Sequence, residues 1–162
     1  MKSLVLMRHS YASSNNPAFS DRERPLTDEG RAIAQTTAEL LTGWNIDRIV
    51  CSSAVRTVET AEIIAAATNT PVHALDALYL AVSTAYRDVP VSLADDNENV
   101  ILVVGHNPGI ASLIMSWTKH PLPVAPCTVA RFTLPAKNWI DIRNSPPELT
   151  DYISDGQRQT LP

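Results

Sequence analysis

The chain has 162 residues, and its 44% of hydrophobic and 19% of charged residues are typical of a globular domain and exclude a disordered chain. A net charge of −4 argues against nucleic acid or an anionic membrane as a partner, and the apolar runs are too short to span a bilayer. The length fits one domain over residues 1–162 better than two. Cys51 and Cys127 are far apart and show no C-x-x-C spacing, which is typical of free thiols in a reducing compartment, so we expect a cytoplasmic protein.

Short apolar runs alternate along the chain with segments of helical periodicity. The runs that predict strands are residues 3–7, 48–51, 72–75, 99–104, 129–134 and 139–142. The first strand is followed by residues 10–25, which are polar and contain proline and therefore predict a loop. Residues 143–162 are also polar and contain proline, and we expect them to form a C-terminal tail.

Helical spacing of apolar residues predicts four helices between these strands. They cover residues 28–42, 54–68, 84–94 and 108–117. Thr27 is a typical N-cap for the first helix, because acidic residues follow it. Ser52 or Ser53 can cap the second helix, and Asn107 precedes Pro108 as the N-cap of the fourth.

Strands that alternate with helices predict one α/β domain in which helices flank a mostly parallel central sheet in three layers. Ligands bind such sheets beyond the carboxyl ends of the strands. Arg8 and His9 follow the first predicted strand, and Arg56 lies one turn after the second. His106 follows the strongest strand, residues 99–104. The strand assignments therefore bring two arginines and two histidines to one edge of the sheet.

Two arginines beside two histidines are typical of an anion site, because guanidinium groups present a fixed fork of donors to phosphate oxygens. A neutral imidazole is a competent nucleophile, so the cluster favours phosphoryl transfer without a metal ion. The four histidines show no local spacing typical of metal ligands. An alternative stays open at this stage, in which Arg56 is an ordinary helix-face charge paired with Glu59 or Glu62.

Four segments, in this order, resemble the motifs of the histidine phosphatase superfamily, which has the phosphoglycerate mutase-like fold. They are residues 2–10 with the Arg-His pair, residues 24–30 with Arg-Pro-Leu-Thr, residues 52–61 with Ser-x-x-x-Arg-Thr, and residues 103–109 with Gly-His-Asn-Pro-Gly. The short length and the last motif resemble the SixA-type phosphohistidine phosphatases.

The resemblance implies a role for each matching residue. His9 would be the nucleophile that is transiently phosphorylated, and water would then hydrolyse the phosphohistidine. Arg8, Arg56 and His106 would bind the oxygens of the transferred phosphoryl group, and Arg24 would complete the phosphate pocket. No metal or organic cofactor is expected. The implied function is a phosphatase that acts on phosphohistidine in a partner protein.

Two departures from the family pattern bear on the substrate. Ser10 replaces the glycine of the Arg-His-Gly signature, and Leu80 stands where relatives often have an acidic proton donor. Asp76 is the nearest carboxylate, and we expect it to be solvated. A site without an acid favours cleavage of N–P bonds, because a phosphorylated imidazole can leave as a neutral ring. The alternatives are a small-molecule phosphomonoesterase for a sugar or nucleotide phosphate, and a non-catalytic module that binds phosphorylated partners.

Overall fold

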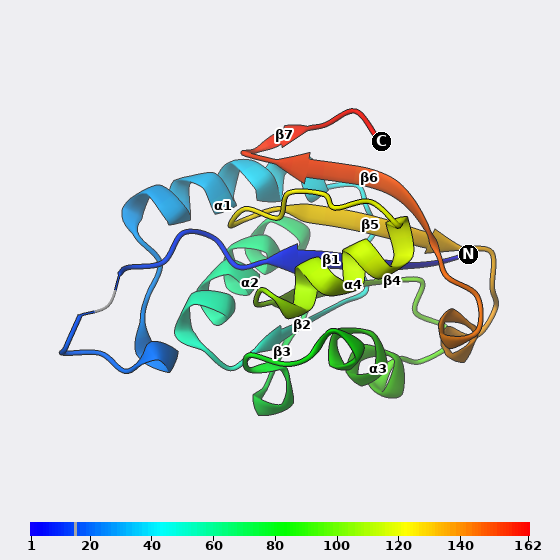
Figure 1. Cartoon of the computed structure of the whole chain (residues 1–162), viewed down its shortest axis with the longest axis horizontal. Coiled ribbons are helices and arrows are strands. Elements are labelled where there is room, and N and C mark those ends of the chain that lie inside the picture. The colour runs from blue at the N-terminus through cyan, green and yellow to red at the C-terminus, as the bar shows by residue number, and fades with distance from the viewer. Residues whose placement is uncertain (15) are drawn as a thin grey trace.

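A seven-stranded sheet crosses the molecule and carries helices on both of its faces (Figure 1). The computed structural model describes residues 1–14 and 16–162. The strands are β1 (Lys2–Arg8), β2 (Arg48–Ser52), β3 (Val72–Leu75), β4 (Val100–Gly105), β5 (Val129–Leu134), β6 (Glu148–Ser154) and β7 (Gln157–Arg158). The helices are α1 (Asp28–Leu41), α2 (Val55–Thr68), α3 (Ser83–Leu93) and α4 (Gly109–Thr118). None of these helices combines the length and apolarity needed to span a bilayer.

The order of the strands in the sheet is β3-β2-β4-β1-β5-β6-β7. The four strands from β3 to β1 are parallel, and β5, β6 and β7 continue the sheet in antiparallel pairs. Every residue of β4 is buried, and this strand lies between β2 and β1, as expected for a central parallel strand. The predicted α/β fold with a mostly parallel sheet is confirmed.

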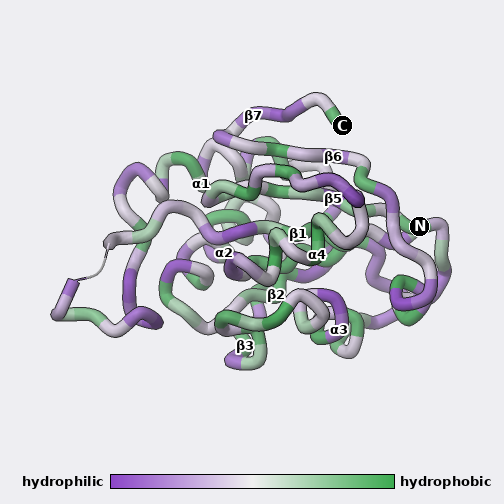
Figure 2. The backbone as a smooth tube through the Cα atoms, viewed as in Figure 1, coloured by the Kyte–Doolittle hydropathy of each residue, from purple (hydrophilic) through white to green (hydrophobic). Residues whose placement is uncertain are grey.

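Alternation along the strands divides the core into two layers. One layer joins Leu4 and Leu6 of β1 to the buried faces of α3 and α4, and the other joins Val5 and Met7 to those of α1 and α2. Figure 2 shows hydrophobic and hydrophilic residues alternating along α1, as expected for a helix that buries one side against the sheet. The carboxyl ends of the parallel strands are left free between these layers.

The ends of the helices follow local hydrogen bonding. The predicted N-cap of α1 is confirmed, because the Thr27 hydroxyl accepts a 2.9 Å hydrogen bond from the backbone N–H of Gly30. The predicted serine cap of α2 is wrong: Ala54 occupies the N-cap position, and the Ser52 hydroxyl accepts from the Ala54 N–H while it also bonds to a histidine. Helix α4 begins one residue later than predicted, at Gly109.

The C-terminal region differs most from the sequence-based expectation. Residues Trp139–Arg143 form a short 3₁₀ helix rather than a strand, because Trp139 and Ile142 are one helical turn apart and are both buried. The expected tail contains β6, which pairs with β5 and buries Tyr152 and Ile153. Its remaining residues are mostly polar, so this outer strand lacks the apolar run by which the inner strands are predicted.

Candidate active site

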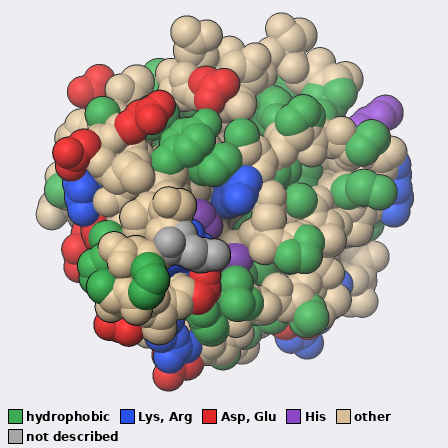
Figure 3. Space-filling model, turned by 60° about the vertical axis from the view of Figure 1, so that its left-hand side comes forward, with side chains coloured by type: hydrophobic (Ala, Val, Ile, Leu, Met, Phe, Trp, Pro, Cys, Tyr) green, Lys and Arg blue, Asp and Glu red, His purple; other side chains and the backbone are tan. Residues whose placement is uncertain are grey.

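A pocket of about 330 Å³ opens beyond the carboxyl ends of β1 and β4. Figure 3 shows histidine and basic side chains gathered around a hollow on this side of the molecule. The residues that the sequence predicts for the site all line this pocket: Arg8, His9, Arg24, Arg56 and His106. The sequence prediction of where they meet agrees with the structure.

His9 is held as a neutral imidazole with one free nitrogen. Its side chain is 8% exposed, and its Nδ1 lies 2.6 Å from the carbonyl oxygen of Ser10. Because a carbonyl only accepts, Nδ1 carries the hydrogen, and Nε2 keeps its lone pair with no hydrogen-bond partner among the described residues. Burial lowers the pKa of His9 to about 4, and the charges of Arg56 and Arg8 act in the same direction. His9 is therefore neutral and nucleophilic at pH 7.

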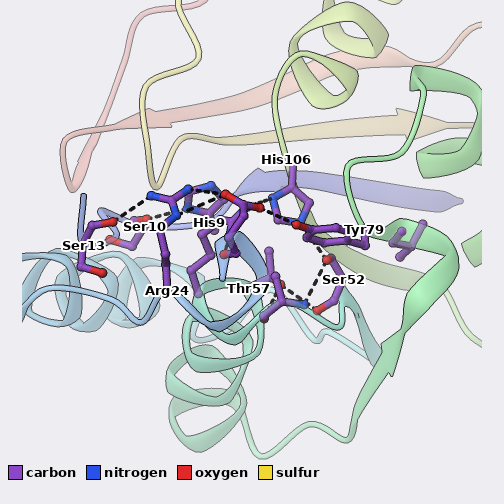
Figure 4. Close-up of polar contacts among 12 residues, drawn as sticks. His9, Ser10, Ser13, Arg24, Ser52, Thr57, Tyr79 and His106 are labelled. Carbon is purple, nitrogen blue, oxygen red and sulfur yellow. Dashed lines mark hydrogen bonds and ion pairs between the residues drawn. The ribbon is translucent and has the colours of Figure 1, made fainter. Parts of the chain in front are cut away.

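His106 is also neutral, in the opposite tautomer. Its Nδ1 accepts a 3.3 Å hydrogen bond from Nη2 of Arg56, because a guanidinium only donates. Its Nε2 therefore carries the hydrogen and donates to the hydroxyl of Ser52 at 2.7 Å (Figure 4). Burial, followed by the charge of Arg56, lowers the pKa of His106 to about 3. The centroids of the His9 and His106 rings are 5.4 Å apart.

Arg56 is a buried charge rather than a solvated helix-face residue. It lies in the first turn of α2 and is 2% exposed. The possible partner Glu59 pairs with Arg31 instead, at 2.9 Å. The Nε atoms of Arg56 and Arg8 are buried without a hydrogen-bond partner among the described residues. Buried donors of this kind are costly unless an acceptor is supplied, so the pocket is suited to an anion.

Asp21 is a functional-site residue that the sequence prediction missed. Its carboxylate accepts hydrogen bonds from Nη2 of Arg24 at 3.0 Å and from Nη2 of Arg56 at 3.1 Å. The hydroxyl of Tyr79 donates to the same carboxylate at 2.5 Å (Figure 4). These hydrogen bonds, that of Tyr79 first, lower the pKa of Asp21 to about 2. The carboxylate is therefore an internal anion that occupies donors of two arginines in the pocket.

Tyr86 fixes the backbone beneath His106. Its hydroxyl accepts from the backbone N–H of His106 and donates to the carbonyl of Leu78, both at 3.0 Å. A Cβ atom at Gly105 would lie 2.3 Å from the Tyr86 ring, and one at Gly109 would lie 2.6 Å from it. Both glycines are therefore required for the ring to approach the end of β4.

The hydroxyl of Ser10 is turned away from the pocket. It donates to the carbonyl of Gly30 at 2.7 Å, and the backbone N–H of Ser10 donates to the Thr60 hydroxyl at 3.1 Å. Ser10 is fully buried in these contacts. The serine therefore ties the residue after His9 to α1 and α2, and it adds no hydroxyl to the pocket.

Leu80 lies in the pocket lining, whereas Asp76 is solvated, as expected. Leu80 lines the pocket, and its φ of 47° is in the left-handed region, which costs a residue with a Cβ roughly 1 kcal/mol. The Asp76 side chain is 81% exposed and pairs with Arg22 at 3.4 Å, outside the pocket lining. The described residues also contain no group of three or more metal-ligating side chains placed to hold an ion.

Comparisons with known proteins agree with the fold. The sequence model of the histidine phosphatase superfamily (branch 1) matches residues 4–79. The solved SixA of Nakamurella multipartitia is 26% identical, with a TM-score of 0.79 over 94% of this chain and 95% of that chain. The SixA of Agrobacterium tumefaciens is 23% identical, with a TM-score of 0.78 over 94% and 97%. An uncharacterized chloroplastic protein of Arabidopsis thaliana is 25% identical over 84% of this chain and 68% of its own length.

Proposed function

Because the chain belongs to the histidine phosphatase superfamily, we propose that this phosphatase removes phosphoryl groups from phosphohistidine in a protein, through a covalent intermediate on His9. The observation that carries the proposal is the buried, neutral imidazole of His9, whose Nε2 is free in a pocket that three arginines line. Neutral Nε2 is the nucleophile that phosphoryl transfer requires, and the arginines supply the positive charge that such transfer otherwise takes from a metal ion.

In the first step, the lone pair of His9 Nε2 forms a bond to phosphorus while the bond to the leaving nitrogen breaks on the opposite side. The unpartnered Nε donors of Arg8 and Arg56 would take up oxygens of the phosphoryl group. A bound dianion favours protonation of His106, whose Nδ1 would then donate to the same group in place of accepting from Arg56. Arg24 would bind the phosphoryl group from the loop before α1.

The leaving group takes the bonding electron pair with it. An imidazole whose other nitrogen already carries a proton departs as a neutral ring, whereas an alkoxide needs a proton from the enzyme. Asp76 is exposed outside the pocket lining, and the pKa of Asp21 is about 2, so Asp76 is not placed to donate a proton and Asp21 is ionised at pH 7. The lack, among the described residues of the pocket, of a carboxylic acid that could protonate an alkoxide favours substrates with an N–P bond. Water then attacks phospho-His9, the electron pair returns to Nε2, and phosphate leaves with the protons of the water.

The proposal is tested by mixing the enzyme with a phosphohistidine peptide and quenching it during turnover. We expect a phosphoryl group on His9 that is labile in acid and stable in alkali. The His9→Ala variant should lose both this group and turnover. The matched control is His73→Ala, because His73 is an exposed histidine of β3 outside the pocket lining.

The same preparations should be compared on an alkyl phosphate. A positioned general acid is worth on the order of 10²–10⁴-fold, so we expect kcat/KM for the alkyl ester to fall behind that for phosphohistidine by about this factor. Wild-type rates in His9→Ala would contradict the covalent mechanism. Equal kcat/KM values for the two substrates would contradict the assignment to phosphohistidine and favour a small-molecule phosphomonoesterase.

A further inference from the structure

An apolar side chain stands at the opening of an otherwise polar pocket. Leu80 lines the pocket together with His9, but it is 55% exposed whereas His9 is 8% exposed. Its backbone has a φ of 47°, in the left-handed region that leucine rarely adopts. A single exposed leucine is common on protein surfaces. It is uncommon, however, for an exposed leucine to be held in an unfavourable backbone conformation at the opening of a site.

The backbone before Leu80 is fixed by three contacts. Leu78 is fully buried, and its carbonyl accepts the hydroxyl of Tyr86 at 3.0 Å. Tyr79 stacks edge-on against His106, with ring centroids 5.6 Å apart, and its hydroxyl is bonded in the pocket. The residue that precedes Leu80 is therefore held against two residues of the pocket lining, His106 and Asp21.

The backbone after Leu80 is fixed by close packing. The carbonyl oxygen of Ala81 lies where a Cβ on Gly109 would be only 2.3 Å away, so this carbonyl rests directly on the first residue of α4. Because Tyr79 and Ala81 are both fixed by contacts, the exposed position of Leu80 is set by the packing of its neighbours.

The chemistry of Leu80 restricts what it can contact. A leucine side chain offers neither a charge nor a hydrogen bond, so it contributes nothing to the phosphoryl oxygens, which suit the arginines. In an in-line displacement the leaving group departs on the side of phosphorus opposite the nucleophile. His9 is a buried member of the pocket lining and Leu80 an exposed one, so Leu80 lies toward the open side of the pocket, the side from which a leaving group carried by a protein would depart.

We propose that Leu80 is a specificity-determining residue that packs against the flat face of the imidazole ring of the phosphohistidine substrate. This inference rests on the proposed function and adds a subsite for the leaving group to it. The subsite selects substrates whose phosphoryl group is attached to a ring, by apolar contact alone.

The test compares two N–P substrates that share a phosphoryl group and differ in the leaving group. A phosphohistidine peptide releases an imidazole ring, whereas phosphoramidate releases ammonia, which is too small to reach Leu80. We expect Leu80→Ala to lower the ratio of kcat/KM for phosphohistidine to that for phosphoramidate by about tenfold, the size of a lost apolar contact. Leu80→Met keeps a long apolar side chain and should keep the wild-type ratio.

Val82→Ala is the matched control, because Val82 is 71% exposed but does not line the pocket. The ratio should not change in this variant. An unchanged ratio in Leu80→Ala, whether both activities persist or both fall together, would overturn the inference and leave the proposed function intact. A wild-type enzyme that does not turn over phosphohistidine at all would overturn the proposed function and the inference with it.

Discussion

At the scale of single residues, the protonation of His9 is the property on which the chemistry depends. An unperturbed histidine would be protonated in part at neutral pH, and a protonated ring is no nucleophile. Burial lowers the pKa of His9, so that the ring is neutral at pH 7, and the charges of the neighbouring arginines lower this pKa further. The positive charges that attract the phosphoryl group therefore also keep its acceptor uncharged.

The titration of His9 is a direct test of this arrangement. By NMR we expect the wild-type imidazole to titrate near pH 4, and Arg56→Ala to raise that pKa, because it removes a positive charge and admits water. Arg31→Ala is the control, since Arg31 pairs with Glu59 outside the pocket lining. A wild-type pKa near 6.5 would contradict the tautomer and the burial assigned here.

The same shift has a consequence for stability. An unfolded histidine takes up its proton near pH 6.5, but folded His9 does so only near pH 4. Between these values the unfolded state binds more protons, so the free energy of unfolding decreases as the pH falls from 6.5 to 4. The stabilising contribution of Asp21, whose pKa is lowered to about 2, is lost at still lower pH, from 3.8 downward.

Asp21 accepts hydrogen bonds from Arg24 and Arg56, two of the arginines to which the proposed function assigns the binding of phosphate. We therefore expect Asp21→Asn to strengthen inhibition by inorganic phosphate by about tenfold, the size expected when one like charge is removed beside a dianion in a partly exposed site. Asp28→Asn is the control, because this exposed carboxylate pairs with Arg31 outside the pocket lining. Weaker inhibition in Asp21→Asn would show that Asp21 positions the arginines rather than competing for them.

Three of the site residues that the sequence predicts share one property, and Asp21 lacks it. Arg8, His9 and His106 follow strands that apolar runs reveal, so their meeting point follows from the topology of parallel sheets. Asp21 lies in a short 3₁₀ turn of the polar loop, and its position is set by hydrogen bonds to side chains distant in sequence. No local pattern predicts bonds of that kind.

At the scale of elements, strands and helices were predictable wherever a buried face imposes a periodicity. Strand β4 is buried throughout and reads as a continuous apolar run. Strand β6 buries only two neighbouring residues, and the rest of it is held by backbone pairing with β5. Backbone pairing leaves no trace in side-chain polarity, so β6 was missed.

Helix α1 offers a local test of how its sequence sets its start. Thr27→Ala removes the acceptor for the Gly30 N–H, and we expect the free energy of unfolding in urea to fall by about 1 kcal/mol. Thr27→Ser keeps the acceptor and should restore most of the loss. Thr36→Ala is the control, because Thr36 is exposed and its hydroxyl donates within the helix, to the carbonyl of Ala32. Equal losses at Thr27 and Thr36 would contradict the capping role.

At the scale of the whole molecule, the sheet has two unequal halves. The parallel half carries the pocket at its carboxyl ends, and the antiparallel half covers the other edge of β1 through β5 and β6. Tyr152 and Ile153 of β6 belong to the two opposite core layers. The C-terminal segment is therefore part of the frame that holds the pocket, and not an appendage to it.

Truncation tests this view of the C-terminal segment. Removal of residues 148–162 deletes β6, and we expect the product to show no cooperative thermal unfolding, because both core layers lose buried side chains. Removal of residues 160–162 deletes only exposed residues, and the midpoint of unfolding should stay nearly unchanged. A cooperative transition in the longer deletion would contradict a structural role for β6.

The contact of Tyr86 with its two glycines also limits how this sequence can diverge. A side chain at position 105 demands a smaller residue at position 86, because the ring occupies that space, and one at position 109 demands in addition a shift of the Ala81 carbonyl. Loss of the ring also removes the hydroxyl that accepts the backbone N–H of His106. Among descendants of this sequence, the three positions should therefore covary, and a lineage that changes one of them alone should lose the alignment of its second histidine before it loses its fold.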